Sequence, residues 1–347
     1  MEAGGDRGHQ VPGSRWGKLT DVDALERSGS VTHPIRGLHH VTATVAEAEP
    51  DLDFCERVLG LRLVKRTVNF DNHSVYHFYY GTEAGEPGTL WTTFPYHGWG
   101  VPVGVHGAGQ VVATAFSVPP GALDAWRERF DAAGVAVEEG PPRFGERPLV
   151  VRDPSGLRLE LVADARDTRA PWIGGELGSA VAIRGLHAVT LMLRSRAPTV
   201  ELMTGLLGFE MVHEEPGRTR LAVGGDLPGH LVDLVDAPQA PQARNGLGTV
   251  HHVAFAIDGA DEQLLLREEL LRAGRQVTEV RDRTYFQSVY FREPGGVLFE
   301  LATMLPGFSV DESPAELGQA LMLPPWEEEH RAEIEATLPP MTSRRGR

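Results

Sequence analysis

The alternation of apolar and polar residues divides the chain into four similar units. Each unit opens with β-forming residues in which every second side chain is apolar, and this alternation predicts a strand. A segment with helical spacing follows and ends at a glycine, and further strand-like segments close the unit, the last often after a Pro/Gly turn. The predicted helical segments cover residues 52–60, 123–134, 200–208 and 264–274. Each unit therefore reads as βαβββ.

Internal repeats support these units independently. Residues 37–42 (GLHHVT) return 148 positions later as residues 185–190 (GLHAVT), and residues 153–161 (DPSGLRLEL) return 140 positions later as residues 293–301 (EPGGVLFEL). A register kept this long indicates four copies of one supersecondary unit. The copies span about residues 35–96, 109–163, 183–236 and 249–303. We therefore predict an α+β fold in which four βαβββ modules form two half-open, barrel-like sheets.

The first and last units carry residues that suit a metal ion. Strand alternation places His40, His252 and Glu300 on the more polar face of their strands, opposite the apolar residues that pack under a helix. Two imidazoles and one carboxylate form the facial triad that holds non-haem Fe(II), and such a triad leaves positions open for a substrate and O₂. We predict Fe(II) as the cofactor, and Mn(II) also suits these ligands.

The two middle units serve as an internal control. Ala188 stands at the place of His40, Ala113 stands at the place of His252, and Glu160 remains at the place of Glu300 without imidazoles beside it. Units 1 and 4 are therefore predicted to form the metal-bearing sheet, and units 2 and 3 a metal-free one.

The roles of the remaining histidines stay open or are predicted to be minor. His39 and His251 precede the predicted ligands, where they could hydrogen-bond them, carry protons near the open positions, or be purely structural. His187 keeps the first position of the pair in a unit without the ligand, which favours a structural part. Solvent or loop positions are predicted for the histidines that lack an acidic partner at a useful spacing, namely His73, His77, His97 and His106.

Composition sets the broad class. The 347 residues, 41% hydrophobic and 23% charged, are typical of a soluble globular protein with two ordinary domains. We expect a flexible tail over residues 1–33, a first domain over 34–163, a linker over 164–182, a second domain over 183–305 and a C-terminal extension over 306–347.

The net charge of −15 argues against a nucleic-acid partner. The chain has no apolar run of 18 residues, so no membrane span is expected. The single cysteine, Cys55, suits the cytoplasm. Edge strands and the C-terminal segment suggest a homodimer.

The repeat architecture over about residues 35–305 resembles the vicinal oxygen chelate superfamily, which includes glyoxalases, bleomycin-resistance proteins and extradiol dioxygenases. A closer likeness is to the branch of hydroquinone ring-cleaving dioxygenases. It rests on several motifs taken together: residues 65–71 (KRTVNFD), 76–81 (YHFYYG), 282–292 (DRTYFQSVYFR), 306–308 (PGF), 311–312 (DE) and 323–325 (LPP).

This resemblance implies an Fe(II)-dependent dioxygenase that opens a hydroquinone-type or catechol-type ring with O₂. It also implies that Arg283 and Tyr290 are substrate-pocket residues. An arginine stabilises a bound phenolate, and a tyrosine hydroxyl can bond a second oxygen. Apolar residues that could line a slot for the ring, or else pack in the core, are Tyr285, Phe286, Phe255 and Trp91, with the core favoured for Phe255.

Two other functions compete with ring cleavage. A glyoxalase-like lyase or isomerase uses its metal as a Lewis acid and characteristically draws a fourth protein ligand from the last strand of the other unit. That strand is predicted at residues 89–94 (TLWTTF), which contain no carboxylate. A non-catalytic bleomycin-resistance-type binding protein needs no metal triad at all. Both alternatives are therefore less consistent with the sequence than a dioxygenase.

Overall fold

The computed structural model describes residues 33–96 and 98–341, so the predicted N-terminal tail lies outside the described residues up to position 32. Four βαβββ modules follow one another. Module 1 contains β1 (Ile35–Val45), α1 (Ala48–Leu52) continued by a π-helical segment (Asp53–Val58), β2 (Arg62–Asn69), β3 (Asn72–Gly81) and β4 (Leu90–Pro95). Module 2 contains β5 (Gln110–Val118), α2 (Leu123–Ala132), β6 (Val137–Glu139), β7 (Leu149–Arg152) and β8 (Arg158–Ala163).

The second half repeats this order. Module 3 contains β9 (Gly185–Leu193), α3 (Ala197–Gly205), β10 (Glu210–Glu215), β11 (Arg218–Ala222) and β12 (Leu231–Asp236). Module 4 contains β13 (Thr249–Ile257), α4 (Ala260–Arg272), β14 (Arg281–Asp282), β15 (Gln287–Arg292) and β16 (Leu298–Thr303). The segment 164–182 between the halves carries no helix or strand. The βαβββ pattern of each module is confirmed.

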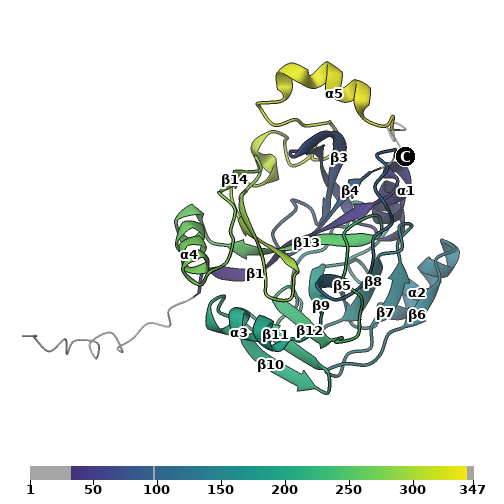
Figure 1. Ribbon diagram of the computed structural model, residues 1–347. Helices are drawn as coiled ribbons and strands as arrows, with labels where there is room; N and C mark the ends of the chain where they lie inside the picture. Colours follow the sequence, from purple (N-terminus) through teal and green to yellow (C-terminus); the bar gives the residue numbers. More distant parts are fainter. Residues whose placement is uncertain (1–32, 97, 342–347) are drawn as a thin grey trace, which may run out of the picture. The chain divides into compact units, whose positions relative to one another are not determined.

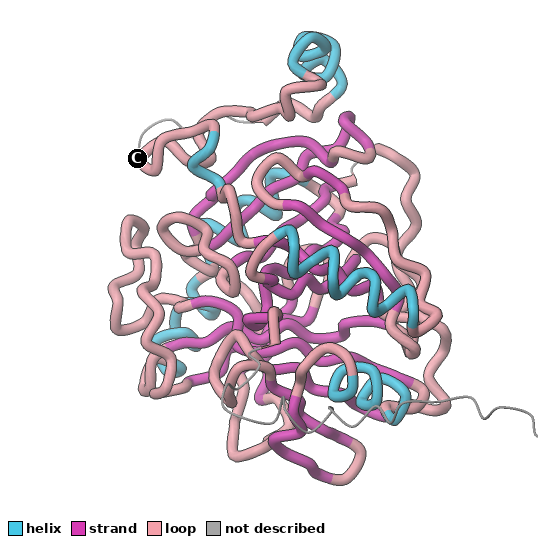
Figure 2. The backbone as a smooth tube through the Cα atoms, turned by 90° about the vertical axis from the view of Figure 1, so that its left-hand side faces the viewer, coloured by secondary structure: helices cyan, strands magenta, loops and turns pink. Residues whose placement is uncertain are grey.

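The modules pair across the two halves of the chain. One eight-stranded sheet has the order β14-β15-β16-β13-β1-β4-β3-β2 and so joins modules 4 and 1, while the other, β10-β11-β12-β9-β5-β8-β7-β6, joins modules 3 and 2. At the centre of the first sheet β1 runs antiparallel beside β13 (Figure 1). Strands dominate the two layers and helices lie around them (Figure 2). The predicted α+β fold with two sheets is therefore correct.

The strand register brings the predicted ligands to one place. His40 pairs with Ala254 across β1 and β13, and Ala254 pairs with Glu300 across β13 and β16. His252 lies two residues from Ala254 and opposite Thr42. Because side chains paired across a sheet, or two apart along a strand, share one face, all three ligands project to the same side.

Apolar alternation decides which side that is. Val41, Ala43 and Val45 on β1 and Val253 and Phe255 on β13 are buried in the main hydrophobic core. Their burial turns the intervening polar residues to the opposite, concave face of the sheet.

The predicted helix ends agree with the structure better than the predicted starts. Each helical segment is followed by a glycine with a left-handed backbone, which glycine adopts without steric penalty: Gly60, Gly134, Gly208 and Gly274. However, α3 begins at Ala197 rather than residue 200, and α4 at Ala260 rather than residue 264. The first turns of these helices contain Pro, Asp and Glu, so the apolar pattern does not include them.

The C-terminal extension is anchored to the first sheet, formed by modules 1 and 4. It contains two short 3₁₀ segments (Phe308–Val310 and Glu328–His330) and α5 (Arg331–Thr337). Lys65 of β2 is fully buried and forms ion pairs with Asp311, at 2.6 Å, and with Glu312. A charge buried in this way is tolerated because both carboxylates compensate it.

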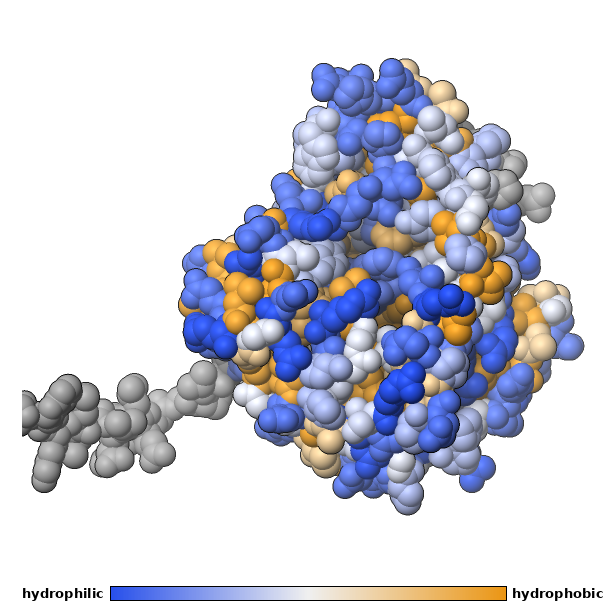
Figure 3. All heavy atoms as spheres, in the orientation of Figure 1, coloured by the Kyte–Doolittle hydropathy of each residue, from blue (hydrophilic) through white to orange (hydrophobic). Residues whose placement is uncertain are grey.

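Hydrophilic side chains cover most of the face seen in Figure 3, with hydrophobic ones scattered among them. No helix within the described ranges has the length and apolar character needed to cross a bilayer.

Candidate metal centre

Three ligand atoms converge on the concave face of the first sheet. The Nε2 atoms of His40 and His252 are 3.1 Å apart, and Oε2 of Glu300 lies 3.3 Å from the first and 2.9 Å from the second. All three residues are buried. Within residues 33–96 and 98–341, no other group of three or more histidine, cysteine or carboxylate ligands has a geometry that could hold a metal ion.

These separations match a facial coordination site. Ligand atoms about 2.1 Å from one cation and at right angles to each other would be about 3.0 Å apart, whereas tetrahedral ligands would be about 3.4 Å apart. The observed distances of 2.9, 3.1 and 3.3 Å centre on the facial value. Oε2 of Glu300 is also buried without a hydrogen-bond partner. A cation between the three side chains would compensate this oxygen.

The protonation states also suit metal binding. Burial tends to raise the pKa of Glu300, but the neighbouring imidazoles of His40 and His252 outweigh it and hold the pKa well below its usual value. Burial lowers the pKa of His252. An ionised carboxylate beside a neutral imidazole is the form in which these side chains bind metals.

Each of the two predicted histidine ligands lies within hydrogen-bond distance of the histidine that precedes it. Nδ1 of His39 lies 2.9 Å from Nδ1 of His40, and Nδ1 of His251 lies 2.7 Å from Nδ1 of His252. Burial, more than any neighbouring charge, lowers the pKa of both preceding histidines to about 3, so they are neutral and can accept a proton donated by the ligand. Such a bond holds the ligand's Nδ1 as N–H and leaves Nε2 free for a metal.

Ser288 is a site residue that the sequence analysis missed. Its hydroxyl donates a short hydrogen bond to Oε1 of Glu300, the oxygen that does not face the imidazoles. Both side chains are fully buried. Ser288 pairs with Ala302 across β15 and β16, which places it diagonally beside Glu300. Serine is common in strands, and its role depends on this register.

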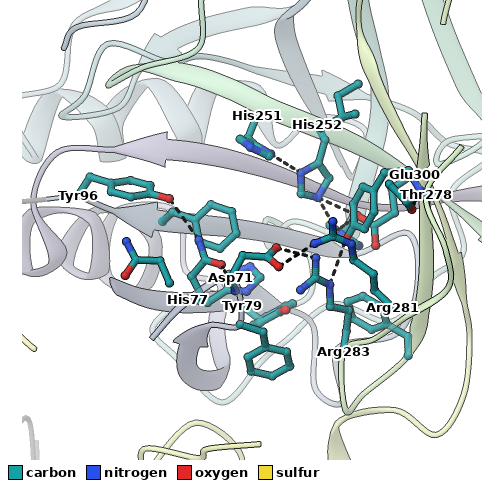
Figure 4. Close-up of a pocket in the computed structure, with 18 residues that line it drawn as sticks. Asp71, His77, Tyr79, Tyr96, His251, His252, Thr278, Arg281, Arg283 and Glu300 are labelled. Carbon is teal, nitrogen blue, oxygen red and sulfur yellow. Dashed lines mark hydrogen bonds and ion pairs between the residues drawn. The ribbon is translucent and has the colours of Figure 1, made fainter. Parts of the chain in front are cut away.

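His77 is the second residue missed. It was predicted to lie in solvent or a loop, and this prediction is wrong: His77 is a buried residue of β3 that lines the pocket (Figure 4). Its Nε2 bonds Oγ1 of Thr92 at 3.1 Å, Thr92 bonds Thr42 at 2.7 Å, and Thr42 contacts Nε2 of His252 at 2.9 Å. Burial holds the pKa of His77 well below its usual value. Its partner is a threonine, so a search for acidic partners could not find it.

The ligands lie in a cavity of about 390 Å³. Phe286, Tyr79 and Phe94 supply aromatic walls. The Phe286 ring lies 5.4 Å from that of His40. Four aromatic residues were predicted either to line a slot for the ring or to pack in the core. Phe286 lines the cavity, and Trp91 and Phe255 pack in the core. Tyr285 is buried outside the cavity lining, and its hydroxyl donates a hydrogen bond to the Asp311 carboxylate. Core packing, the alternative favoured for Phe255, is therefore correct for Phe255 and Trp91, and the pocket role is wrong for these two and for Tyr285 because none of them lines the cavity.

Arg283 and Tyr290 line the same cavity. Nε of Arg283 donates to the Tyr290 hydroxyl at 3.2 Å, and the Tyr290 ring lies 5.8 Å from that of His252. Burial raises the pKa of Tyr290, with Glu300 adding to the effect, so the phenol stays protonated. Burial tends to lower the pKa of Arg283, but Tyr290 and Asp71 outweigh it.

The second sheet has other residues at the positions equivalent to the predicted histidine ligands, and its remaining glutamate has another partner. Ala113 pairs with Thr190, as His252 pairs with Thr42, so the equivalence predicted from the repeats is correct. Glu160 remains, but the buried guanidinium of Arg143 forms a short ion pair with it. Here an arginine supplies the positive charge that the carboxylate requires.

Comparisons with known proteins agree with this geometry. A family model described as the Glyoxalase/Bleomycin resistance protein/Dioxygenase superfamily matches residues 37–161 and 185–301. The chain belongs to this superfamily. Its fold also resembles glyoxalase I from Zea mays, with a TM-score of 0.58 and 15% identity over 77% of this chain and 92% of the other.

More similar relatives are ring-cleaving dioxygenases. MhqO of Bacillus subtilis, whose assignment as such an enzyme is provisional, is 41% identical over 89% of this chain and 97% of its own length. A chlorohydroquinone/hydroquinone 1,2-dioxygenase of Sphingobium indicum is 35% identical over 88% and 96%. The crystal structure of a provisionally assigned dioxygenase from Bacillus subtilis has a TM-score of 0.85 and 40% identity over 90% and 99%. The chain is thus a member of the dioxygenase branch.

Proposed function

We propose that this protein is a non-haem Fe(II)-dependent dioxygenase that opens a hydroquinone-type aromatic ring with O₂. The observation that carries the proposal is the facial arrangement of His40, His252 and Glu300 at the end of an aromatic-walled cavity. The similarity to a chlorohydroquinone/hydroquinone 1,2-dioxygenase supports the substrate class. Mn(II) would fit the same donors.

His40, His252 and Glu300 would hold the metal through two nitrogens and one oxygen. Fe(II) held there would bind a ring hydroxyl and O₂ and would supply the redox chemistry of the reaction. His39 and His251 orient the imidazoles by accepting their Nδ1 protons, and Ser288 orients the carboxylate. The ligands therefore need little rearrangement when the metal binds.

The other pocket residues would bind and orient the substrate. The Arg283 guanidinium favours the ionised form of a ring hydroxyl because it supplies a fixed positive charge in a poorly solvated site. The Tyr290 hydroxyl remains a donor at neutral pH and can bond an oxygen on the substrate. Phe286, Tyr79 and Phe94 give the ring apolar contacts. A cavity of about 390 Å³ lies in the range of small-molecule sites.

The structure makes the lyase alternative less favourable. The strand expected to supply a fourth ligand is β4, which lies parallel to β1 and pairs Thr92 with Thr42 beside the metal ligands. Threonine hydroxyls stand there in place of a carboxylate. A three-ligand site with an open side suits binding of both substrate and O₂ better than Lewis-acid isomerisation with four protein ligands.

Reconstitution tests the proposal. The purified chain is loaded anaerobically with Fe(II) or Mn(II), and oxygen uptake is measured with substituted hydroquinones and catechols. Ring cleavage is checked by mass spectrometry of the product formed under ¹⁸O₂, which should contain both oxygen atoms. His40→Ala should abolish metal retention and uptake together. Stoichiometric metal binding without oxygen uptake on any member of the panel would refute the dioxygenase and favour the lyase.

A further inference from the structure

Asp71 connects the two edges of the metal-bearing sheet. It lies in the turn between β2 and β3, and β2 is one edge strand of the sheet while β14 is the other. One carboxylate oxygen accepts from Arg281 at 2.7 Å and the other accepts from Arg283 at 2.9 Å. These residues are 210 and 212 positions away in the sequence, and all three line the pocket (Figure 4). Asp71 therefore spans the open side of the half-barrel directly over the pocket.

The metal-free sheet shows which partners the equivalent arginine takes there. Arg143 stands 140 positions before Arg283, and Glu160 stands 140 positions before Glu300. Arg143 turns inward and pairs with the carboxylate of Glu160, and its Nε lies 3.4 Å from carboxylate oxygens of both Glu146 and Asp233. Arg283 instead bonds Asp71 and Tyr290. The equivalent arginine thus has two alternative partners: the acid on β8 or β16, or an acid at the pocket mouth.

The backbone turns begin alike at the two arginines, whose N–H groups donate to the carbonyls of Glu146 and Phe286, each three residues further on. Phe144, which follows Arg143, has φ of 47°, and Thr284, which follows Arg283, has φ of 64°. They are the non-glycine residues with positive φ in the described part of the chain. A left-handed conformation is especially unfavourable for a β-branched residue such as threonine. Its presence in both modules indicates that the two arginines begin similar turns, and their side chains have different partners.

We propose that Asp71 is a positioning residue that holds the Arg283 guanidinium over the pocket and away from Glu300, so that the carboxylate is free to bind a metal cation. The inference rests on the proposed metal centre. If Arg283 were released, it could pair with Glu300 as Arg143 pairs with Glu160, and a guanidinium beside the carboxylate would compete with the metal. Asp71 also keeps the positive charge of Arg283 where a ring oxygen of the substrate would lie.

The test compares metal affinity in four variants, measured by Mn(II) titration calorimetry on the full chain without turnover. Asp71→Asn should weaken Mn(II) binding about tenfold, the lower end of the range for a lost supporting contact. Asp71→Glu should bind Mn(II) nearly as the wild type does, because it keeps the charge. The double variant Asp71→Asn/Arg283→Met should recover wild-type affinity within about threefold, because the competing guanidinium is gone.

Asp258→Asn is the matched control. Asp258 also forms a part-exposed ion pair between modules, with Arg36, but it lies outside the pocket lining. The affinity of the Asp258→Asn variant for Mn(II) should equal that of the wild type. Unchanged affinity in Asp71→Asn would overturn the inference, and so would a double variant as weak as Asp71→Asn, since general structural damage is not repaired by removing an arginine. Failure of the wild type itself to bind Mn(II) or Fe(II) would refute the metal centre, and the inference with it.

Discussion

Replacing Ser288 by alanine tests how the metal centre is organised. The Ser288 hydroxyl donates to Oε1 of Glu300 in a region that water does not reach, since both side chains are fully buried. A hydrogen bond to a charged group contributes about 1.5–3 kcal/mol. Supporting residues of this kind typically change metal affinity about 10- to 100-fold, or roughly 1.4–2.7 kcal/mol. The two ranges agree, so Ser288→Ala should raise the Kd for Mn(II) by about 10- to 100-fold.

The assay is Mn(II) titration followed by oxygen uptake at saturating Fe(II). Uptake should recover substantially at high metal concentration, because the three ligands remain. Thr114→Val is a suitable control, because Thr114 on β5 is a buried hydroxyl of the metal-free sheet without a hydrogen-bond partner. A Kd in Ser288→Ala within twofold of the wild type would show that the hydrogen bond does not organise the site. An equal rise in Thr114→Val would show that the effect is a general loss of stability.

Three further predictions test other parts of the molecule. Tyr290→Phe should lower kcat about 10- to 100-fold in oxygen-uptake assays while Mn(II) affinity stays unchanged, because it removes one donor to the substrate and no metal ligand; equal kcat would exclude that role. Asp51→Asn should stabilise the protein at pH 8 but not at pH 4. Burial raises the pKa of Asp51 to about 6 from 3.8, so the folded chain holds a proton that the unfolded chain releases over this range. Stability therefore falls by about 2 kcal/mol between pH 4 and pH 6, out of about 3 kcal/mol in total once the pH is well above 6. Thermal melts of variant and wild type should therefore diverge over this window, and parallel curves would contradict the buried-carboxyl argument. Arg143→Ala should lower the free energy of unfolding by roughly 1.5–3 kcal/mol, because it removes one charged partner of the buried Glu160 carboxylate while Arg158 remains. Mn(II) affinity should be unaffected, and a large loss of metal binding would show that the two sheets are coupled.

The module boundaries and the ligand faces were predictable because they depend on local patterns. The copies predicted at residues 35–96, 109–163, 183–236 and 249–303 agree with the observed strands to within a residue at most ends. Alternation along a strand directs His40 to one face wherever the strand is placed, provided that Val41 is buried. The first turns of α3 and α4 were missed because polar residues and proline begin these helices.

The supporting residues were not predictable in the same way. Ser288, His77 and Asp71 lie in motifs that carry the family resemblance, but their contacts cannot be read from these motifs because their partners lie on other segments of the fold. His77 was assigned to solvent because its partner, Thr92, carries no charge. Its position follows from the pairing of β3 with β4, which places Tyr79 opposite Thr92.

The sequence by itself determined the repeat, the three side chains proposed as metal ligands and the sheet face on which each lies, because these depend on spacing along one strand and on comparison among four copies. The tertiary structure decided which atoms meet. The pairing of β1 with β13 brings His40 and His252 within 3.1 Å, and the approach of the β2 and β14 edges places Asp71 against Arg283. Such contacts join residues about 210 positions apart, and they form only when the curled sheet brings its distant strands together.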